Sequence, residues 1–358
     1  MRSEVLQSDE AVQNDPTKSW QIETPYDTRQ LAIQEAITAL KAAITNKKRG
    51  NIAHFQLGYK SRKMPKQVFC VDSAAIKKVM KKAKPVKKGK GKKSKTQPVS
   101  GHAWLQMFPS RLGPHKYIRV RKRALKGLPD TFERDCKIMK YGKEYYLLYT
   151  FDKDIRVAET EKEDLLALDP GVRTFQTGYS PSGLVMKCGE RQSALIRVLH
   201  ERLDGLRSLR SKAFQKRKQR LRNTCLRVEH KIFNTIENLH NHTASHISKH
   251  FKAVLLPSFG TSVMQKGTTL ASTTKRDLWT LSHYKFQQKL IGLCNQQGTT
   301  LYIVEEDFTT KTCGTCGMLQ DVGKTKIFQC RSCEYKQDRD VHGARNILLK
   351  HLTQHGAN

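Results

Sequence analysis

Four cysteines have the spacing of metal ligands. Cys313 and Cys316 form one Cys-x-x-Cys pair, Cys330 and Cys333 form a second, and thirteen residues separate the two pairs. With two residues between them, both thiolates of a pair can bind one ion, and four thiolates complete the tetrahedral shell of Zn²⁺. The intervening chain is long enough for a short hairpin, as in a zinc ribbon. The sequence therefore predicts a structural zinc site that leaves no coordination position open for catalysis.

Acidic residues follow two segments that have the composition of buried strands. Asp169 follows the apolar run 165–168, and Glu305 and Glu306 follow the run 301–304. A carboxylate at the end of a buried strand is costly to desolvate unless a cation lies near it. Neighbouring strand residues face opposite sides of a sheet, so only one of the two glutamates can join Asp169. The spacing alone leaves the choice between Glu305 and Glu306 open.

A third acid lies at the start of a predicted helix beyond the zinc ligands. Asp340 precedes Ala344 by four residues and Ile347 by seven, which places it on the packed face of that helix. Asp338, by contrast, is expected to cap the helix or to lie on the surface. Carboxylates gathered around one point bind Mg²⁺, and two such ions stabilise the attacking and leaving oxygens of a phosphodiester. Asp169, Asp340 and one glutamate are therefore candidates for phosphodiester hydrolysis.

The charge of the chain predicts a polyanionic partner. The 358 residues include 66 Lys and Arg against 32 Asp and Glu, a formal net charge of +34, and nucleic acid is the first candidate partner. From 207 to 222, eight of sixteen residues are basic, and we expect this stretch to contact a phosphate backbone rather than only solvent. These residues are Arg207, Arg210, Lys212, Lys216, Arg217, Lys218, Arg220 and Arg222.

Other classes of protein are excluded by composition. No window approaches the roughly 18 apolar residues of a membrane span, and residues 1–15 lack the apolar core of a secretory signal. The nine cysteines are an odd number, and those outside the two pairs, at 70, 136, 188, 225 and 294, have no metal spacing. We therefore expect core packing for these five, a reducing compartment, and no disulfide framework. A secreted or membrane protein is not expected.

The first half of the chain predicts a helix and then short strands. Thr24 and Pro25 indicate a helix start, and apolar residues at helical spacing extend the helix to about residue 46. Alternating or aromatic segments at 53–57, 117–120 and 145–151 predict strands of a small barrel or sheet. Eleven lysines in 77–95 predict a disordered, solvated loop, which could contact phosphates or serve in nuclear import.

The second half predicts alternating strands and helices. A buried strand ending at Asp169 and a hairpin to about 187 precede a helical stretch at 191–250. A strand at 253–256, a helix at 278–293 and a strand at 301–304 follow. This order predicts an α/β domain that brings the strand-end acids to one place.

These motifs together resemble those of a known family. The stretch from Glu306 through the four cysteines to Asp340 and Asn346 resembles the C-terminus of TnpB proteins, which are transposon-encoded, RNA-guided DNA nucleases. Fanzor proteins are their eukaryotic and viral relatives. Leu168-Asp-Pro-Gly-Val resembles the first RuvC motif of the family, and looser matches at 24–29 and 135–138 extend the resemblance over most of the chain from about residue 20.

The resemblance implies an α/β fold: an RNase H-like (RuvC) nuclease domain with an inserted zinc ribbon, preceded by helical recognition and small β-barrel (wedge) parts. Little precedes residue 24, so the recognition part is expected to be shortened. The implied parts are a recognition part at 1–50, a wedge at 51–160 with a lysine-rich loop at 77–98, the first part of the RuvC domain at 161–308, the zinc ribbon at 309–337, the C-terminal RuvC helix at 338–353 and a tail at 354–358.

The resemblance also implies which residues bind the catalytic metal. Many TnpB proteins carry their second acid on the strand that matches 254–259, where this chain has none. Fanzor-like and some TnpB sequences instead place a glutamate seven residues before the first ribbon cysteine, and Glu306 occupies that position. A Fanzor-like member with Mg²⁺ bound by Asp169, Glu306 and Asp340, as two ions, is therefore expected. His342-Gly343 departs from the Asn-Ala that relatives often have.

An RNA-guided DNA endonuclease is the function that the resemblance implies. Its partners would be a guide RNA and a double-stranded target DNA with a short flanking motif read by the protein, while base pairing reads the sequence. The protein would act in the nucleus if its host is eukaryotic or viral, and otherwise in the cytoplasm. Two alternatives stay open: a decayed nucleic-acid-binding transposon protein without catalysis, and a transposase that joins DNA ends.

Overall fold

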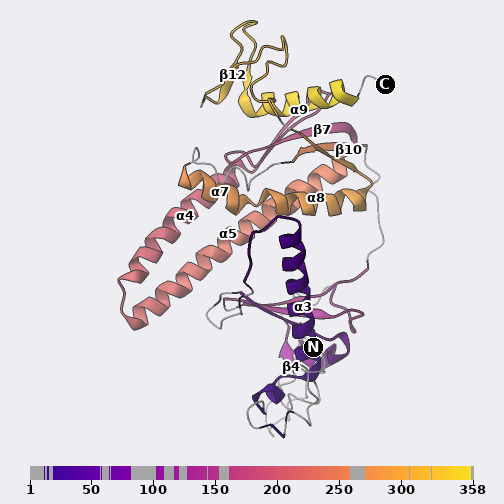
Figure 1. Cartoon of the computed structure of the whole chain (residues 1–358), viewed down its shortest axis with the longest axis vertical. Coiled ribbons are helices and arrows are strands. Elements are labelled where there is room, and N and C mark those ends of the chain that lie inside the picture. Colours follow the sequence, from indigo (N-terminus) through magenta and orange to yellow (C-terminus); the bar gives the residue numbers. More distant parts are fainter. Residues whose placement is uncertain are drawn as a thin grey trace, which may run out of the picture. The chain divides into compact units, whose positions relative to one another are not determined.

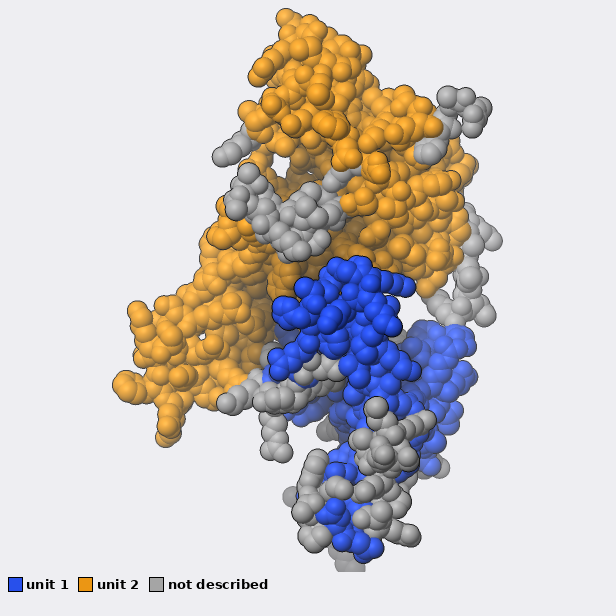
Figure 2. Space-filling view, viewed as in Figure 1, with its two compact units in different colours: residues 1–153 blue, residues 154–358 orange. Residues whose placement is uncertain are grey.

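The computed structural model contains two compact units, Met1–Lys153 and Asp154–Asn358 (Figure 2). The boundary is close to the expected start of the nuclease domain at 161. Glu306 and residues 82–101, most of the lysine-rich segment, lie outside the described residues. The structure describes residues 12, 14–15, 19–56, 58, 64, 66–81, 102–108, 117–120, 127–142, 144–152, 161–258, 271–305, 307–323 and 325–355.

Unit 1 combines a helix with two small sheets. The helix α3 (Tyr26–Lys48) confirms the first predicted helix, although Pro25 rather than Thr24 is its N-cap. Its Glu35 accepts hydrogen bonds from Cys70 Sγ at 3.1 Å and Lys137 Nζ at 3.0 Å, which join α3 to a sheet. The described strands are β1 (Lys66–Val71), β2 (Ile76–Lys81), β3 (His102–Met107), β4 (Tyr117–Arg119), β5 (Cys136–Tyr141) and β6 (Glu144–Leu148).

The two sheets of unit 1 share one hydrophobic core. Their strand orders are β1-β5-β6 and β2-β3-β4, and all pairs are antiparallel. Val71, Ile76 and Phe132 are among the buried side chains between them. The start of the predicted lysine-rich loop was wrong, because Lys77 and Lys78 belong to β2 and pair with β3. The predicted strand at 53–57 is also absent over its described residues, 53–56.

Unit 2 is built on a mixed five-stranded sheet with the order β11-β10-β7-β8-β9. The strands β7, β10 and β11 are parallel, whereas β8 and β9 continue antiparallel from β7 as a meander. The predicted hairpin and the two buried strands β7 and β10 are therefore confirmed. The third predicted strand is present as β11, but its expected burial was wrong, because it is the edge strand and Tyr302 and Ile303 are 45% and 46% exposed. The bounds of these strands are β7 (Glu163–Pro170), β8 (Gln176–Tyr179), β9 (Val185–Cys188), β10 (Phe251–Pro257) and β11 (Thr300–Val304).

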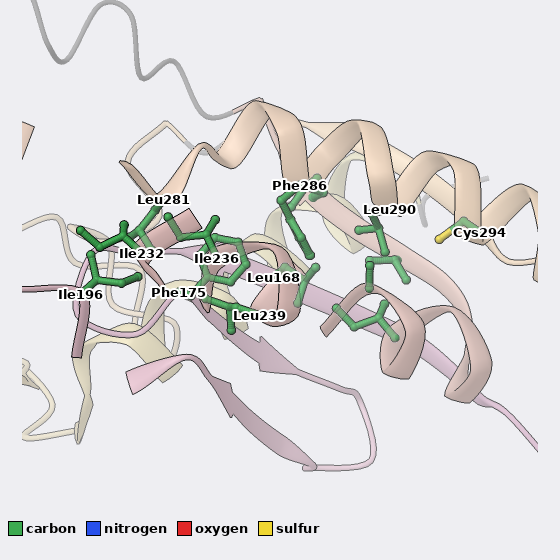
Figure 3. Close-up of a cluster of buried hydrophobic side chains, with 14 of the residues drawn as sticks. Leu168, Phe175, Ile196, Ile232, Ile236, Leu239, Leu281, Phe286, Leu290 and Cys294 are labelled. Carbon is green, nitrogen blue, oxygen red and sulfur yellow. The ribbon is translucent and has the colours of Figure 1, made fainter. Parts of the chain in front are cut away.

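Helices cover both faces of this sheet (Figure 1). One face packs against α4 (Glu190–Ser211), α5 (Gln215–His250), α7 (Ser272–Leu281) and α8 (His283–Gln297), and the other against α9 (Arg339–His355). Alternation along β7 divides its side chains: Leu166 and Leu168 enter the first core (Figure 3), whereas Leu165 and Ala167 contact the α9 side. Asp169 has the same parity as Ala167, so it faces α9.

Two of the predicted helices are each divided in the structure. The stretch 191–250 forms the hairpin α4–α5 with a break at 212–214, and 278–293 belongs to α7 and α8 with a break at Ser282. At each break a serine hydroxyl bonds a backbone carbonyl three residues back, Ser211 to Ser208 at 2.7 Å and Ser282 to Trp279 at 3.0 Å. Such bonds compete with the helix. No helix in the described ranges is both long and apolar enough to cross a bilayer.

Candidate functional site

The four cysteines of the predicted zinc site lie together in the structure. Their sulfurs are all within 4.8 Å of one another. Cys313 Sγ is 3.6 Å from Cys333 Sγ, and Cys316 Sγ is 3.6 Å from Cys330 Sγ. Four sulfurs at about 2.3 Å from a tetrahedral Zn²⁺ would be about 3.8 Å apart. The cluster therefore fits zinc in both ligand type and geometry.

Backbone amides favour the thiolate form that a metal binds. Hydrogen bonds from the backbone of Cys333 and Ser332 lower the pKa of Cys330 to about 6. Ser332 N lies 3.3 Å from Cys330 Sγ. Burial opposes ionisation of Cys313, but hydrogen bonds from the backbone of Cys316 and Thr315 still lower its pKa. The turns thus favour the thiolate at one cysteine of each pair, Cys313 and Cys330. At Cys333 the Tyr335 backbone bond acts in the same direction, but desolvation and the neighbouring cysteines raise the pKa of its thiol to about 12.

The cysteine cluster and its hairpin pack onto α9. The hairpin consists of β12 (Ile327–Gln329) and β13 (Lys336–Asp338), and the Phe328 ring stacks on His342 of α9 with centroids 3.7 Å apart. A Cβ on Gly314 would lie 2.3 Å from Asn346 Oδ1, so only glycine permits this approach. Asn346 Nδ2 also donates to the carbonyls of Thr309 and Thr312, both at 2.7 Å. Cysteine cluster and helix therefore form one packed part.

The same helix approaches Asp169. A Cβ on Gly343 would lie only 2.6 Å from Asp169 Oδ2. Asp340 precedes Gly343 by three residues in the first turn of α9, and residues at that spacing share a helix face. The fold therefore brings the β7 carboxylate against the helix turn that carries Asp340. This contact also gives a physical reason for glycine at 343, where an alanine methyl group would meet Asp169.

Asp338 has the capping role that was expected from the sequence. Its Oδ1 accepts hydrogen bonds from the backbone N–H of Asp340 at 3.0 Å and of Val341 at 3.3 Å. Its Oδ2 accepts from Lys187 Nζ of β9 at 2.7 Å. Burial opposes its ionisation, but the Lys187 bond and the two amides hold the pKa of Asp338 below its usual value. Asp340 is a further carboxylate near Lys187, and it contributes to the raised pKa of that lysine.

The position expected for the third acid is bracketed by described residues. Before it, Val304 packs on the α9 side of the sheet and Leu301 packs on the opposite side. After it, the Asp307 carbonyl accepts from Lys350 Nζ of α9 at 3.4 Å. Glu305 is exposed. Among the described His, Cys, Asp and Glu residues, the four-cysteine cluster is the group close enough to hold a metal.

The eight basic residues lie at one end of the α4–α5 hairpin (Figure 1). Arg207 is held by Glu229 Oε1 at 2.9 Å, and Arg210 and Arg222 are half-buried. The other five, Lys212, Lys216, Arg217, Lys218 and Arg220, are exposed. Sequence reasoning missed Phe214, which lies among these cations with 91% of its surface exposed. An aromatic residue inside an acid-free basic run was the available signal.

Comparisons with known proteins identify the family. Residues 283–347 match the family model of the Cas12f1-like TNB domain. A TnpB-like protein of Acanthamoeba polyphaga mimivirus is 30% identical over 213 residues, which cover 57% of this chain and 40% of the relative. A "Putative transposase" of Paramecium bursaria Chlorella virus 1 is 30% identical over 345 residues, 95% of this chain and 73% of the relative. The chain belongs to the TnpB family.

More distant similarity of this TnpB-family chain extends to CRISPR proteins. The CRISPR-associated endodeoxyribonuclease Cas12f1 of Sulfoacidibacillus thermotolerans is 24% identical over 213 residues, 57% of this chain and 49% of the relative. The structure resembles that of a CRISPR-Cas12f ternary complex with a TM-score of 0.40 and 14% identity, over 97% of this chain and 76% of that one. A likeness this distant carries no argument about function.

Proposed function

We propose that this TnpB-family chain is an RNA-guided DNA endonuclease of transposon origin. The observation that carries the proposal is the packing of Asp169 against Gly343, one helical turn from Asp340. Asp169, at the end of β7 in the mixed sheet, thereby lies against the helix turn that carries Asp340, from a distant part of the chain. Mg²⁺ bound there would supply the activated water and stabilise the leaving oxygen of a phosphodiester.

The third ligand in this proposal is Glu306. Tyr302 and Val304 support it, since both have the parity of residue 306 and contact the α9 side, Tyr302 through a ring contact with His351. The hydrogen bond from Lys350 Nζ of α9 to the Asp307 carbonyl also supports Glu306 as the third ligand, because it places the residue directly after 306 next to α9. Glu305 has the parity of Leu301, which packs on the opposite face of the sheet.

The fold assignment in this proposal is an RNase H-like (RuvC) domain with an inserted zinc ribbon. It is supported by the mixed sheet covered by helices on both faces and by the cysteine cluster that packs on α9. Zinc would have a structural role, holding the chain between β11 and α9 in one conformation. Unit 1 would supply the recognition and wedge parts, and the remaining domain limits stay as predicted from the sequence.

A guide RNA and a double-stranded DNA with a short flanking motif are the proposed partners. The net charge of +34 and the exposed cations of the α4–α5 hairpin support nucleic acid as the ligand. The lysine-rich residues 82–98, which follow β2, are proposed as a nuclear-import signal, which agrees with relatives in viruses. In this scheme, base pairing reads the sequence while the protein binds the heteroduplex by its shape.

The proposal is tested by purifying the chain expressed from its native locus with flanking DNA and sequencing the RNA bound to it. We expect one discrete RNA with a fixed scaffold and a variable end. Replacing that end should redirect cleavage to a matching DNA in Mg²⁺ and not in EDTA. A heterogeneous RNA pool that salt removes would instead favour the non-catalytic alternative. Strand-transfer products would favour a transposase.

A further inference from the structure

The turn of the α4–α5 hairpin presents a large apolar ring to solvent. Phe214 is 91% exposed, more than any other large hydrophobic residue in the described part of the chain. It follows the break at 212–214 and is the N-cap of α5, with extended backbone at φ −77° and ψ 165°. Its carbonyl accepts a hydrogen bond from Lys218 N at 2.7 Å, so the start of the helix fixes its backbone. The exposed ring is therefore attached to a backbone position that a helical hydrogen bond defines.

Packing within the hairpin does not explain this ring. The buried residues nearest the turn are Leu203 on α4 and Cys225 on α5, many residues away along each helix. Leu209, which is closer to the turn, is itself 51% exposed. None of the ring pairs among the described residues includes Phe214. A single exposed aromatic is ordinary on a protein surface, so the case for a ligand rests on the charges that surround this ring.

The surroundings of the ring are positively charged and contain no acid. No Asp or Glu occurs between 205 and 228, and Glu229 is engaged by Arg207 at 2.9 Å. Lys212 precedes the ring by two residues, and Lys216 and Arg217 follow it closely, all three exposed. Cations on both sides of a ring match the phosphates on both sides of a nucleotide base.

We propose that Phe214 is a stacking platform for an unpaired base of a nucleic acid strand whose flanking phosphates are bound by the neighbouring cations. This inference deepens the proposed function, because it rests on nucleic-acid binding and specifies an unstacked nucleotide as the ligand at the turn. The strand is either the RNA or an unwound DNA strand, since every base has a flat face that can stack. A fully paired duplex offers the ring no accessible base face away from its ends.

The test measures the affinity of the full-length protein for three probes: a single-stranded DNA, the RNA of the same sequence, and a fully paired DNA duplex of that sequence without a loop or overhang. The variants are Phe214→Ala and Phe214→Trp, with Trp279→Ala as the matched control, since Trp279 is 72% exposed on α7 outside the basic run. We expect Phe214→Ala to weaken single-strand binding about 5- to 100-fold. Duplex binding should change less than about 2-fold, and Phe214→Trp should retain wild-type affinity.

A charge variant separates stacking from phosphate contact. Lys216→Ala combined with Lys218→Ala should weaken binding of all three probes and reduce the salt dependence of binding, whereas Phe214→Ala should leave that dependence unchanged. The single-strand probe that loses more affinity identifies RNA or DNA as the ligand. Equal binding by wild type and Phe214→Ala overturns the inference, as does an equal loss for single strand and duplex or a change of oligomeric state.

The inference and the proposed nuclease function fail separately. Binding at the turn does not require the carboxylates, so the Phe214 effect should also be present in an Asp169→Ala background. If that background binds with the same Phe214 dependence but the wild type never cleaves, the stacking site stands and the nuclease proposal falls. If the wild type cleaves DNA but Phe214→Ala binds single strands like the wild type, the nuclease proposal stands and the stacking site falls.

Discussion

At the scale of single residues, the contact between Asp169 and Gly343 is the most demanding feature of the candidate site. Asp169 reaches the backbone of α9 at a place where a Cβ would come within 2.6 Å of its Oδ2. The helix has little room to shift away from this carboxylate, because α9 is also packed against the sheet through Ile347 and Leu348. The position of one carboxylate therefore depends on the absence of a side chain on another element.

Gly343→Ala is predicted to damage the site. The added methyl group must displace Asp169 or shift α9, and overpacking of this kind costs about 1–3 kcal/mol. We expect a lower midpoint of urea unfolding and a loss of DNA cleavage of about 10-fold or more. Gly205→Ala in α4 is the matched control, since a Cβ there meets nothing within 4 Å. That control should leave the free energy of unfolding unchanged or raise it by up to about 1 kcal/mol. Wild-type stability and cleavage in Gly343→Ala would contradict the prediction, because they would show that the site tolerates a methyl group beside Asp169.

Residues with strict spacing were predictable from the sequence, and residues that depend on tertiary contact were not. The two cysteine pairs and the cap Asp338 are local patterns, and the structure has both. The approach of Gly343 to Asp169 joins segments far apart in the chain, so no local pattern encodes it. Phe214 was missed because helical periodicity runs through the break that exposes it.

At the scale of elements, α9 connects the cysteine cluster to the sheet. Its start is held by Asp338, which both caps the helix and pairs with Lys187 of β9. We predict that Asp338→Ala lowers the free energy of unfolding by about 1 kcal/mol through loss of the cap, and reduces cleavage because Asp340 lies in the released turn. Asp338→Asn keeps a good capping side chain and loses only the charge, so most of the stability should remain. Equal losses in both variants would assign the effect to the ion pair instead.

On the face of the sheet that packs against α4, α5, α7 and α8, two histidines are buried next to the Phe175 ring. The rings of His240 and His283 stack on Phe175 with centroids 5.1 and 5.0 Å away, and His240 Nε2 donates to the Leu281 carbonyl at 2.9 Å. Burial lowers the pKa of His240 to about 4 and that of His283 to about 3. Both imidazoles are therefore neutral in the folded protein at neutral pH.

Acid is predicted to weaken this packing. The unfolded chain binds protons at these histidines below about pH 6.5, whereas the folded chain does not until lower pH, so stability falls as the pH falls from about 6.5 toward 4. Each imidazole should contribute a loss of about 1–2 kcal/mol between pH 7 and pH 5, measured by urea unfolding. A His240→Gln variant should lose less over the same interval. An identical pH dependence in that variant would contradict the role of His240.

The order of elements was more predictable than the continuity of the helices. The strands β7, β10 and β11 were predicted because each contains a short apolar run, and α3 because its apolar residues keep helical spacing. The breaks at 212–214 and Ser282 coincide with hydrogen bonds from serine hydroxyls to backbone carbonyls, which composition does not indicate. The predicted lysine-rich loop was given too early a start at residue 77. Lys78 belongs to a strand, and its Nζ contacts Leu128 O at 3.0 Å and Asp130 Oδ1 at 3.1 Å.

At the scale of the whole molecule, zinc is predicted to be required for the stability of unit 2, because the cysteine cluster packs directly on α9. Metal analysis should find about one zinc per chain. Cys330→Ser should lose it and lower the melting temperature by about 5 °C or more, since 1 kcal/mol corresponds to about 2–4 °C in a domain of this size. Cys188→Ser, outside the cluster, should retain zinc. A zinc-free protein with unchanged melting would contradict a structural role.

The nuclease proposal concerns the molecule as a whole, because its carboxylates come from β7, from α9 and from the chain that follows β11. Cleavage of a matching DNA in Mg²⁺ by the protein loaded with its own RNA tests it most directly. Asp169→Ala, Asp340→Ala and Glu306→Ala should each reduce cleavage about 100-fold or more while DNA binding persists, and Glu305→Ala should cleave like the wild type. Wild-type cleavage by Asp169→Ala would contradict the assignment of the site.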